Sequence, residues 1–485
     1  MKLGELHCEA SAARDVEIRG LALDSRRVEP GDLFLAFPGT QLDGRDFMAD
    51  AAAAGAAAIL MEPGYSGAVP DSVPVVELEC LRDQVGTLAS TFYGHPSRAM
   101  KVVGVTGTNG KSTCVWQIAC ALNMLGVRAG LSGTLGRGFP ESPRASVLTT
   151  LDAVSLQATL AELRAAGATA AVIEVSSHGL QQGRANGIRF HTALFTNLSH
   201  DHLDYHHDMN AYRAAKRRLF FMPGLEFAVL NADDDFGRVL IEELRGRLRV
   251  ISYGVESTEA DLRLSDIRNF RDGSSARIES SFGSGEFRSR LLGHFNLENL
   301  LAVTGALVSL GLKLETVLEV LPRLDPVVGR MQVFGGEGTP RVVVDYAHTP
   351  DALEKAIQAL RAHTDGRLFC VFGCGGDRDT AKRPVMGGAA ESLADVVILT
   401  DDNPRTEPGD QIVEDILRGM CHPERVIVER ERRRAIERAL SEASAEDVVL
   451  VAGKGHETYQ ILRDSVVPFD DLQIAREALY GEENR

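Results

Sequence analysis

A glycine-rich turn at residues 104–113, GVTGTNGKST, has the composition of a phosphate-binding loop. It lies between an apolar strand-like run and a helical run, so its backbone N–H groups and the helix N-terminus face the same point. Lys111 is suited to neutralise the outer phosphates, and Ser112 can hold Mg²⁺. Val105 replaces the first glycine of a strict P-loop pattern, and the alternative is a bare glycine turn that caps a helix. We predict nucleotide binding by Gly107, Thr108, Asn109, Gly110, Lys111, Ser112 and Thr113.

A carboxylate and a histidine-rich segment follow two further predicted strands. Glu174 lies late in an apolar run, and residues 200–207, HDHLDYHH, follow the run 192–198. Histidines alone suggest zinc, but zinc sites usually have three or four N or S ligands, whereas phosphoryl transfer uses Mg²⁺ held by few protein oxygens. We therefore favour Mg²⁺. His206 and His207 are interpreted as residues of a solvated loop.

Three polar groups in the last third of the chain also follow apolar runs. They begin at Arg378, Asp402 and Gly453, and in a parallel sheet they line one crevice. Two arginines can hold a carboxylate in bidentate fashion, and Asn403 and Glu457 can accept hydrogen bonds from an ammonium group. The pocket therefore suits a zwitterionic amino acid. Its candidate residues are Arg378, Asp402, Asn403, Pro404, Arg405, Gly453 and Glu457.

The elements that position these groups alternate between strand and helix patterns. Residues 101–107 are an apolar, β-branched strand, and residues 112–126 have helical spacing. The repeated βαβ order predicts an α/β fold with parallel sheets. Breaks near residues 95–97 and 326–330 suggest three domains. These are 1–97, a small α/β domain; 98–328, a central P-loop-type ATPase domain; and 329–485, a Rossmann-like domain.

Composition narrows the class of protein. A chain of 485 residues exceeds the limit of about 250 to 300 residues for one core. Its net charge of -16 argues against broad binding to nucleic acid or anionic membranes. Seven cysteines without a CxxC pair indicate a reducing compartment. We see no secretory signal and no apolar run of about 20 residues, so we expect a cytoplasmic protein. The alanine-rich run 51–58 is predicted to be a helix packed on a sheet.

The glycine-rich turn resembles the TGTNGK(S/T)T signature shared by Mur ligases and folylpolyglutamate synthetases, which is narrower than a generic P-loop. The resemblance covers nearly the whole chain, and its DNPR turn resembles the diaminopimelate-adding type of Mur ligase. Lysine-adding relatives replace the arginine of this turn, so Arg405 carries the specificity. The other matching segments are VSSHGL (175–180), NLSHDHLDYH (197–206), HFNLENLLA (294–302), DYAHTPDAL (345–353), GCGGDRD (373–379) and AGKGHE (452–457).

The resemblance also implies roles for residues that local patterns leave undecided. Lys216, next to Arg217 and Arg218, is a surface charge by periodicity alone, whereas in the family the matching lysine is carbamylated and helps to hold a second Mg²⁺. His200 stands where such proteins often carry arginine. The implied catalytic residues are Lys111, Glu174, His202 and Lys216, and the implied metal ligands are Ser112, Glu174, His202 and carbamylated Lys216.

The remaining assignments by resemblance concern the two large substrates. Leu151 departs from the TTP sequence of many relatives, which makes the backbone at this point less predictable. The residues implied for the UDP-linked substrate are Leu23, Ser25, Thr40, Gln41, Leu42, Thr149, Thr150, Ser176, Gln182 and Arg184. In addition to the residues of the glycine-rich turn, the residues implied for ATP binding are Asn296, Asn299, Arg330, Asp345 and His348.

The implied reaction couples ATP to formation of a peptide bond. A carboxylate and an amine do not condense in water, so the γ-phosphate passes to the carboxylate and the amine then attacks the acyl phosphate. We expect small-molecule substrates, a monomeric enzyme, and closure of the third domain after ATP binds. The alternatives are folylpolyglutamate synthetase or another Mur ligase, a nucleotide-gated switch, and a catalytically silent binding module.

Overall fold

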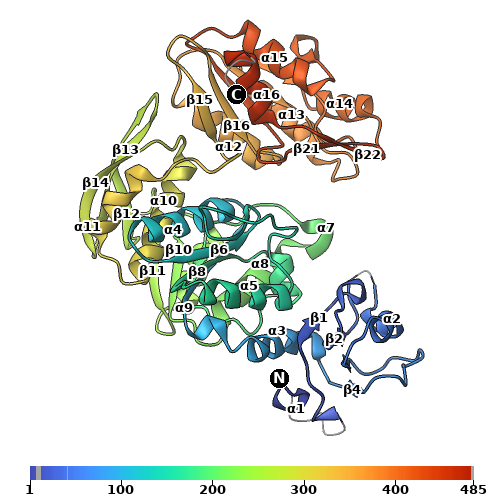
Figure 1. Cartoon of the computed structure of the whole chain (residues 1–485). Coiled ribbons are helices and arrows are strands. Elements are labelled where there is room, and N and C mark those ends of the chain that lie inside the picture. The colour runs from blue at the N-terminus through green and yellow to red at the C-terminus, as the bar shows by residue number, and fades with distance from the viewer. Residues whose placement is uncertain (7–12, 41, 482–485) are drawn as a thin grey trace. The chain divides into compact units, whose positions relative to one another are not determined.

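The computed structural model of the chain describes residues 1–6, 13–40 and 42–481. Both of its compact units mix helices with sheets (Figure 1), which confirms the predicted α/β class. The predicted domain boundaries after residues 97 and 328 stay a prediction. The first unit comprises Met1–Tyr253 and Ala302–Leu312, and the second comprises Gly254–Leu301 and Lys313–Arg485.

A four-stranded parallel sheet in the order β1-β2-β3-β4 is built from the first part of the chain. The alanine-rich run is only partly helical, contrary to the prediction. The helix ends at Ala53, because Gly55 takes a left-handed conformation with φ +99°, and a strand starts at Ala58. The strands are β1 (Gly20–Ala22), β2 (Asp32–Ala36), β3 (Ala58–Met61) and β4 (Val75–Glu77).

The central sheet of the first unit runs in the order β11-β10-β9-β5-β8-β6-β7, parallel except for the edge strand β7. Helix α4 packs against β6 and β8, and α9 packs against β10 (Figure 1). Its strands are β5 (Lys101–Thr106), β6 (Ala129–Gly133), β7 (Gly136–Gly138), β8 (Ala170–Glu174), β9 (Thr192–Phe195), β10 (Phe227–Asn231) and β11 (Arg249–Gly254).

The helices of the first unit include the predicted helix after the glycine-rich turn, found at Lys111–Met124. They are α1 (Leu3–Leu6), α2 (Met48–Ala53), α3 (Leu81–Phe92), α4 (Lys111–Met124), α5 (Ala153–Ala165), α6 (Ser177–Gln181), α7 (Leu203–His206), α8 (Met209–Arg217) and α9 (Asp235–Leu244). Short 3₁₀ helices are η2 (Ser25–Arg27), η3 (Gly44–Phe47), η4 (Pro96–Arg98) and η5 (Arg218–Phe221).

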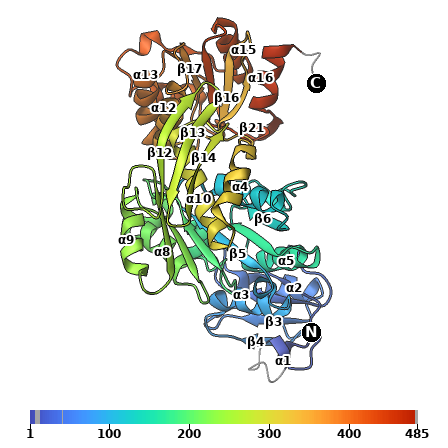
Figure 2. The same cartoon turned by 90° about the vertical axis from the view of Figure 1, so that its left-hand side faces the viewer.

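The second unit begins with an antiparallel meander, whose three long strands lie side by side in Figure 2. These strands are β12 (Leu262–Phe270), β13 (Gly273–Ser280) and β14 (Gly283–Ser289). The division between the units falls within helix α10 (His294–Ser309). Helix α11 (Leu314–Val320) packs on β14 and is followed by η6 (Leu321–Arg323).

A six-stranded sheet in the order β15-β16-β20-β17-β18-β19 forms the rest of the second unit, parallel except for β15. Its strands are β15 (Gln332–Gly335), β16 (Arg341–Asp345), β17 (Leu368–Phe372), β18 (Val396–Leu399), β19 (Ile427–Val428) and β20 (Val448–Ala452). The other elements are α12 (Pro350–Arg361), α13 (Lys382–Leu393), α14 (Gly409–Leu417), η7 (Pro423–Arg425), α15 (Arg432–Glu442), the hairpin β21 (Tyr459–Leu462) and β22 (Ser465–Pro468), and α16 (Asp471–Tyr480).

Both faces of this sheet are covered, which explains why its strands are continuous apolar runs. Alternate residues point to opposite faces: Val343 belongs to a core with α12, α13 and α14, whereas Val342 and Val344 belong to a core with α15 and α16. With both faces closed, ligands can reach the sheet only at its ends. None of the helices in the described part of the chain is long and apolar enough to cross a membrane.

An ion pair at the amino ends of the same strands yields a prediction about acid stability. Burial alone would raise the pKa of Asp447, but hydrogen bonds from Ser444 and Arg367 outweigh it and lower the pKa from 3.8 to about 2. The ionised form is therefore favoured in the folded state, and this stabilisation is complete above the unfolded pKa and is lost as the pH falls through about 2. We expect a contribution of about 1 to 2 kcal/mol, discounted because Arg367 is half exposed.

Denaturant unfolding of the wild type and of Asp447→Asn at several pH values measures this contribution. The difference between their unfolding free energies should be largest above about pH 5 and shrink between about pH 4 and pH 2. A difference that does not change with pH would show that the carboxylate charge contributes nothing.

Candidate active site

The glycine-rich turn connects the end of β5 at Thr106 to the start of α4 at Lys111. Gly107 has φ +150°, and Gly110, with φ +82°, precedes the first residue of the helix. Both conformations favour glycine. The N–H groups of the first helical turn are therefore available to an anion at the carboxyl edge of the central sheet. This is the geometry that the sequence predicts for phosphate binding.

A second loop, which follows β9, holds this turn in place. The Asn197 side-chain oxygen accepts from the Asn109 N–H at 2.9 Å, and Thr196 Oγ1 donates to the Asn109 carbonyl at 2.6 Å. The Lys111 ammonium group donates to the Thr108 carbonyl at 2.8 Å. The sequence analysis missed Thr196 and Asn197, although their position directly after a buried parallel strand was a usable signal.

The close approach of these two loops predicts that position 107 tolerates only glycine. A Cβ atom there would lie 1.8 Å from Thr196 Oγ1, and φ is +150°. Gly107→Ala should therefore displace the turn and weaken ATP binding about tenfold or more, measured by calorimetric titration. Gly126→Ala is the matched control, because Gly126 also has positive φ but a Cβ atom at that position would have nothing within 4 Å. Equal ATP affinity in wild type and Gly107→Ala would refute the prediction.

A buried carboxylate lies next to the start of α4. Glu174, the last residue of β8, is 2% exposed. It accepts from Ser112 Oγ at 3.1 Å and from the Thr134 N–H at 2.9 Å. A carboxylate and a hydroxyl are oxygen donors of the kind that Mg²⁺ prefers, so the donor set fits that ion. Among the described residues, no three His, Cys, Asp or Glu side chains group as a metal site.

Lys216 is buried, contrary to the surface position that periodicity alone predicts. It is 1% exposed, its Nζ donates to the Gly107 carbonyl at 2.6 Å, and it lies 4.4 Å from the centre of the Tyr212 ring. Within the described chain it has no ion-pair partner. Burial, and next the charge of Lys111, lower its pKa well below the usual value. The amine therefore lies directly beneath the phosphate-binding turn, where burial favours its neutral form.

The histidines of residues 200–207 differ in their surroundings. His206 is 4% exposed and hydrogen-bonds Ser177 Oγ at 2.9 Å, so the prediction of a solvated loop is wrong for this residue. It is wrong because the segment forms the short helix α7, which turns His206 inwards. His207 is exposed, as predicted. His202 has φ +55°, and its ring lies 4.9 Å from the His178 ring.

Five residues assigned to the UDP-linked substrate come together beside Glu174. Thr150 Oγ1 donates to the Glu174 carbonyl at 2.8 Å and lies 3.1 Å from Ser176 Oγ. Arg184 Nη1 donates to the Thr150 carbonyl at 2.8 Å, and its Nε donates to the Gln182 side chain at 2.9 Å. The fifth residue, Thr149, bonds to Thr134, which the sequence analysis missed.

The other residues assigned to that substrate lie in the four-stranded sheet. Leu23 follows β1, and Ser25 is buried at the start of η2. Thr40 and Leu42 are exposed on the loop after β2. Gln41 lies outside the described residues.

The predicted amino-acid pocket follows β17, β18 and β20 of the six-stranded sheet. A Cβ atom at Gly375 would lie 2.9 Å from Arg405 Nη1 and 3.6 Å from Arg378 Cγ, so both arginine side chains approach this glycine. Arg405 itself has φ +51°, and its Nη1 donates to the Gly376 carbonyl at 2.8 Å. The Arg405 guanidinium group and the Arg378 side chain therefore come close to the same loop, and two guanidinium groups are suited to hold a carboxylate.

A hydrogen-bonded cluster lies beside this pair. Asn403 Nδ2 donates to Glu457 at 3.0 Å, and Lys454 donates to Glu457 at 3.2 Å and to Asn403 Oδ1 at 3.3 Å. Lys454 is fully buried and was not among the predicted pocket residues. Its place inside the GKGHE segment was the signal that could have identified it. A Cβ atom at Gly453, which has φ +115°, would lie 2.6 Å from the Asp402 carboxylate. Pro404 completes the turn and is also buried.

The residues of the second unit that were assigned to ATP form two groups. Asp345, at the end of β16, accepts from the N–H groups of Met331 and Ala347 at 2.7 and 2.8 Å. Its pKa is raised, because burial outweighs the nearby Arg330 charge and these hydrogen bonds. Arg330 lies over the ring of Tyr346, whose ring also contacts His348. In helix α10, Asn299 Nδ2 donates to the Asn296 side chain at 3.2 Å.

Comparison with protein families matches three segments of the chain, which together make up most of its length. Residues 17–93 match the Mur ligase family catalytic domain, residues 105–307 match the Mur ligase middle domain, and residues 329–455 match the Mur ligase glutamate ligase domain. The chain belongs to the Mur ligase family. It is accordingly an ATP-dependent amino-acid ligase.

Individual relatives of this Mur ligase share its full length. It is 52% identical to the UDP-N-acetylmuramoyl-L-alanyl-D-glutamate–2,6-diaminopimelate ligase of Ectopseudomonas mendocina, over 97% of this chain and 96% of the relative. It is 50% identical to the protein of the same name from Pseudomonas aeruginosa, over 99% and 98%. A solved structure with that name is 38% identical, covers 99% of this chain and 98% of its own, and superposes with a TM-score of 0.74.

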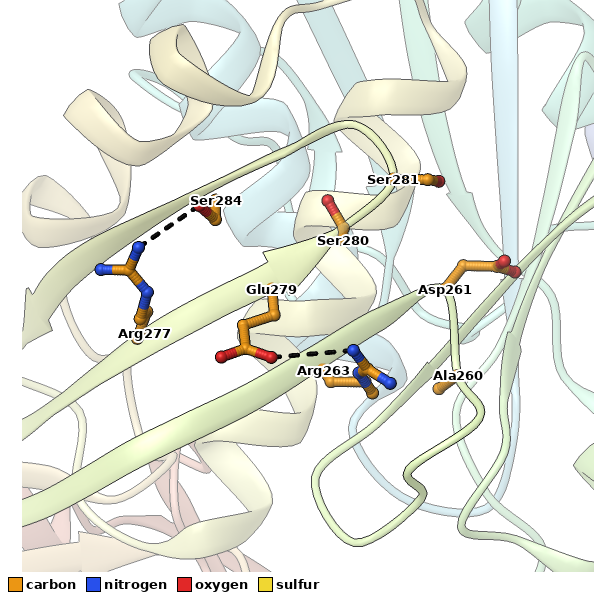
Figure 3. Close-up of a pocket in the computed structure, with 8 residues that line it drawn as sticks. All are labelled: Ala260, Asp261, Arg263, Arg277, Glu279, Ser280, Ser281 and Ser284. Atoms are coloured by element: carbon orange, nitrogen blue, oxygen red, sulfur yellow. Dashed lines mark hydrogen bonds and ion pairs between the residues drawn. The ribbon is translucent and has the colours of Figure 1, made fainter.

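A hollow of about 460 Å³ on the β12–β14 meander of this Mur ligase lies apart from the predicted residues (Figure 3). Its cations are already engaged: Arg263 pairs with Glu279 at 3.7 Å, and Arg277 donates to Ser284 Oγ at 3.4 Å and pairs with Glu286 at 3.5 Å. The hollow therefore offers no unneutralised charge for a phosphate or carboxylate, unlike the loops at the carboxyl ends of the parallel strands.

Proposed function

We propose that this Mur ligase adds meso-2,6-diaminopimelate to the D-glutamyl γ-carboxylate of UDP-N-acetylmuramoyl-L-alanyl-D-glutamate, with formation of ADP and phosphate, in the synthesis of peptidoglycan precursors. The observation that carries the proposal is the pair Arg378 and Arg405, whose side chains both approach Gly375. Diaminopimelate has a second carboxylate at the end of its side chain, and lysine has none. The names of relatives about 50% identical to the chain support the same substrate.

The first chemical step is transfer of the γ-phosphate of ATP to the substrate carboxylate. The N–H groups after Gly110 and the ammonium group of Lys111 are placed to stabilise charge on the transferring phosphoryl group. Lys111 bonds to the Thr108 carbonyl in this structure, so it must exchange that bond for phosphate oxygens. Arg184, with a neutral Gln182 beside it, is suited to hold the anionic substrate near Glu174.

The proposed metal is Mg²⁺, which would supply positive charge to offset that of the phosphates. Ser112 and Glu174 would hold it, because their oxygens are adjacent at the start of α4. His202 and a carbamate on Lys216 are the further proposed ligands. Buried Lys216 is suited to that modification, since its lowered pKa favours the unprotonated amine, the form that reacts with CO₂.

The second step is attack of the diaminopimelate amine on the acyl phosphate, which releases phosphate. The proposed role of Arg378 and Arg405 is to hold the distal carboxylate, while Asn403 and Glu457 accept from the distal ammonium group. Lys454 already donates to Glu457, so the ligand would share this carboxylate with it. A cytoplasmic setting is supported by the substrates and by the free thiols of the described cysteines.

The decisive experiment measures phosphate release from ATP by the purified protein with UDP-N-acetylmuramoyl-L-alanyl-D-glutamate and Mg²⁺. Meso-diaminopimelate and L-lysine are offered in parallel, and the tripeptide product is identified by mass spectrometry. Product with diaminopimelate alone supports both reaction and specificity. Product with lysine alone would refute the proposed substrate, and silence with both would refute the proposed reaction.

A further inference from the structure

The two arginines of the proposed amino-acid pocket come from different loops. Arg378 lies on the loop between β17 and α13, and Arg405 lies on the loop between β18 and α14. The distance between their guanidinium groups therefore depends on how these loops are joined. Direct bonds make one link: the Gly376 N–H donates to the Asn403 carbonyl at 2.9 Å, and Arg405 Nη1 donates to the Gly376 carbonyl at 2.8 Å.

A second link passes through Arg383, in the first turn of α13. Its side chain is 1% exposed. Nη2 donates to Glu407, on the loop after β18, at 2.9 Å and to the Gly375 carbonyl, on the loop after β17, at 3.3 Å. Nη1 donates to Asp415 of α14 at 2.9 Å. One guanidinium group therefore contacts both loops and the helix that follows the second loop.

Glu407 extends this link to the residue next to Arg378. Its carboxylate accepts from the Asp377 N–H, and Asp377 in turn accepts from Thr406 Oγ1 at 2.7 Å and from the Thr406 N–H at 3.2 Å. Asp377 has φ +55° and Arg405 has φ +51°, so both flanking positions adopt an uncommon backbone conformation that its surroundings must maintain. At Asp377 these surroundings include Glu407, which Arg383 holds, and at Arg405 they include the Ile461 carbonyl, which accepts from the Arg405 N–H at 3.2 Å.

We propose that Arg383 is a positioning residue that, through Glu407, sets the separation of Arg378 and Arg405 and so the selectivity for an amino acid with a distal carboxylate. The inference rests on the proposed function, and it assigns to Arg383 an indirect role. Arg383 holds Glu407 and Asp415 with two separate nitrogen atoms, Nη2 and Nη1, whereas lysine has a single nitrogen on a shorter side chain. Selectivity thus depends on a residue that the amino acid does not touch.

The two carboxylates held by Arg383 provide a matched pair of variants. Glu407→Ala removes the Arg383 partner that lies on the same loop as Arg405. Asp415→Ala removes the Arg383 partner that lies on α14. Among the residues that the structure describes, Asp415 makes no hydrogen bond to either loop, so in this variant Arg383 keeps its bonds to Glu407 and Gly375. Each variant removes one partly buried carboxylate from the same guanidinium group. Loss of stability alone should affect both variants alike.

The test measures kcat and KM for diaminopimelate, KM for ATP, and turnover with L-lysine, with thermal unfolding of each variant as a check on folding. Glu407→Ala should raise KM for diaminopimelate about tenfold, with kcat and KM for ATP changed less than about threefold. Asp415→Ala should leave all three constants near those of the wild type. Arg383→Lys should resemble Glu407→Ala, because the lysine side chain ends one atom short of Nη2, which bonds Glu407 and the Gly375 carbonyl.

The outcomes separate this inference from the proposed function. A wild type that uses diaminopimelate, with the same KM in Glu407→Ala, Arg383→Lys and Asp415→Ala, would overturn the positioning role only. Equal rises of KM in Glu407→Ala and Asp415→Ala would also overturn it, because they would show a general loss of structure. A wild type that does not use diaminopimelate overturns the proposed function. In that case the same comparison, made with the amino acid that is used, tests whether Arg383 positions its binding site.

Discussion

Replacing Arg405 with alanine is expected to lower kcat/KM for meso-diaminopimelate by about 10² to 10³-fold. Truncating one partner of a hydrogen-bonded charge pair costs about 2 to 5 kcal/mol, and each 1.36 kcal/mol is about tenfold in rate. Arg405 Nη1 is already aligned by the Gly376 carbonyl, so little further ordering is needed when the carboxylate binds. The measurement is steady-state phosphate release at varied diaminopimelate.

Turnover of L-lysine by the Arg405→Ala variant distinguishes a loss of carboxylate recognition from a general loss of structure or activity. Because lysine lacks the distal carboxylate, its low turnover should change less than about tenfold in Arg405→Ala, and the preference for diaminopimelate should largely disappear. KM for ATP should stay unchanged. If the preference survives intact, Arg405 does not carry the specificity.

Arg463→Ala is the matched control for this variant. Arg463 is also an arginine with φ +51°, exposed on the turn between β21 and β22, and its N–H donates to the Arg405 carbonyl. The control removes one positive charge from a left-handed position in the same domain. It should therefore reproduce any effect of net charge or backbone conformation, but it should keep the preference for diaminopimelate.

The strands around the candidate site could be predicted because both faces of each sheet are covered. That arrangement produces apolar, β-branched runs such as residues 101–106 and 341–345, followed at once by polar residues. The order of the strands could not be predicted. Strand β20 lies between β16 and β17 although it comes later in the chain, and that placement depends on contacts between distant segments that no local pattern contains.

The burial of single polar residues was harder to predict. Periodicity alone predicts that Lys216 is a surface charge, because Arg217 and Arg218 follow it. Its side chain shares a helix face with Tyr212 and Leu219, four residues before and three after, and both are fully buried. That spacing was the available signal. His206 was missed for a different reason, because a four-residue helix is too short to show a period.

Replacing Lys216 with methionine is expected to lower kcat by about 10³-fold or more while the protein stays folded. Methionine matches the length and the burial of the lysine side chain, so packing against Tyr212 is retained. The variant loses the group that lies beneath the phosphate-binding turn, within 2.6 Å of the Gly107 carbonyl. Such a loss corresponds to about 4 kcal/mol of transition-state stabilisation. The rate of phosphate release, measured in assays stopped at fixed times with ATP and the other substrates saturating, gives kcat directly.

Lys101→Met controls for the loss of a lysine from the same unit. Lys101 is exposed at the start of β5, where its ammonium group donates to the Leu310 carbonyl, at the opposite end of the strand from Lys216. This variant should keep kcat within about threefold of the wild type. A Lys216→Met variant as active as Lys101→Met would show that the buried amine has no part in the reaction.

The chemical state of Lys216 separates a carbamate from a plain amine. Burial lowers the pKa of Lys216 and so favours the neutral amine, which adds CO₂ and loses a proton to form a carbamate with two oxygen donors. Protein equilibrated with ¹³C-bicarbonate should therefore show one slowly exchanging carbamate carbon signal, absent in Lys216→Met and present in Lys101→Met. Lys216→Glu, which supplies a carboxylate directly, should retain more activity than Lys216→Met. Absence of the carbon signal in active wild type would mean that the amine acts unmodified, by donating to the turn that holds the phosphates.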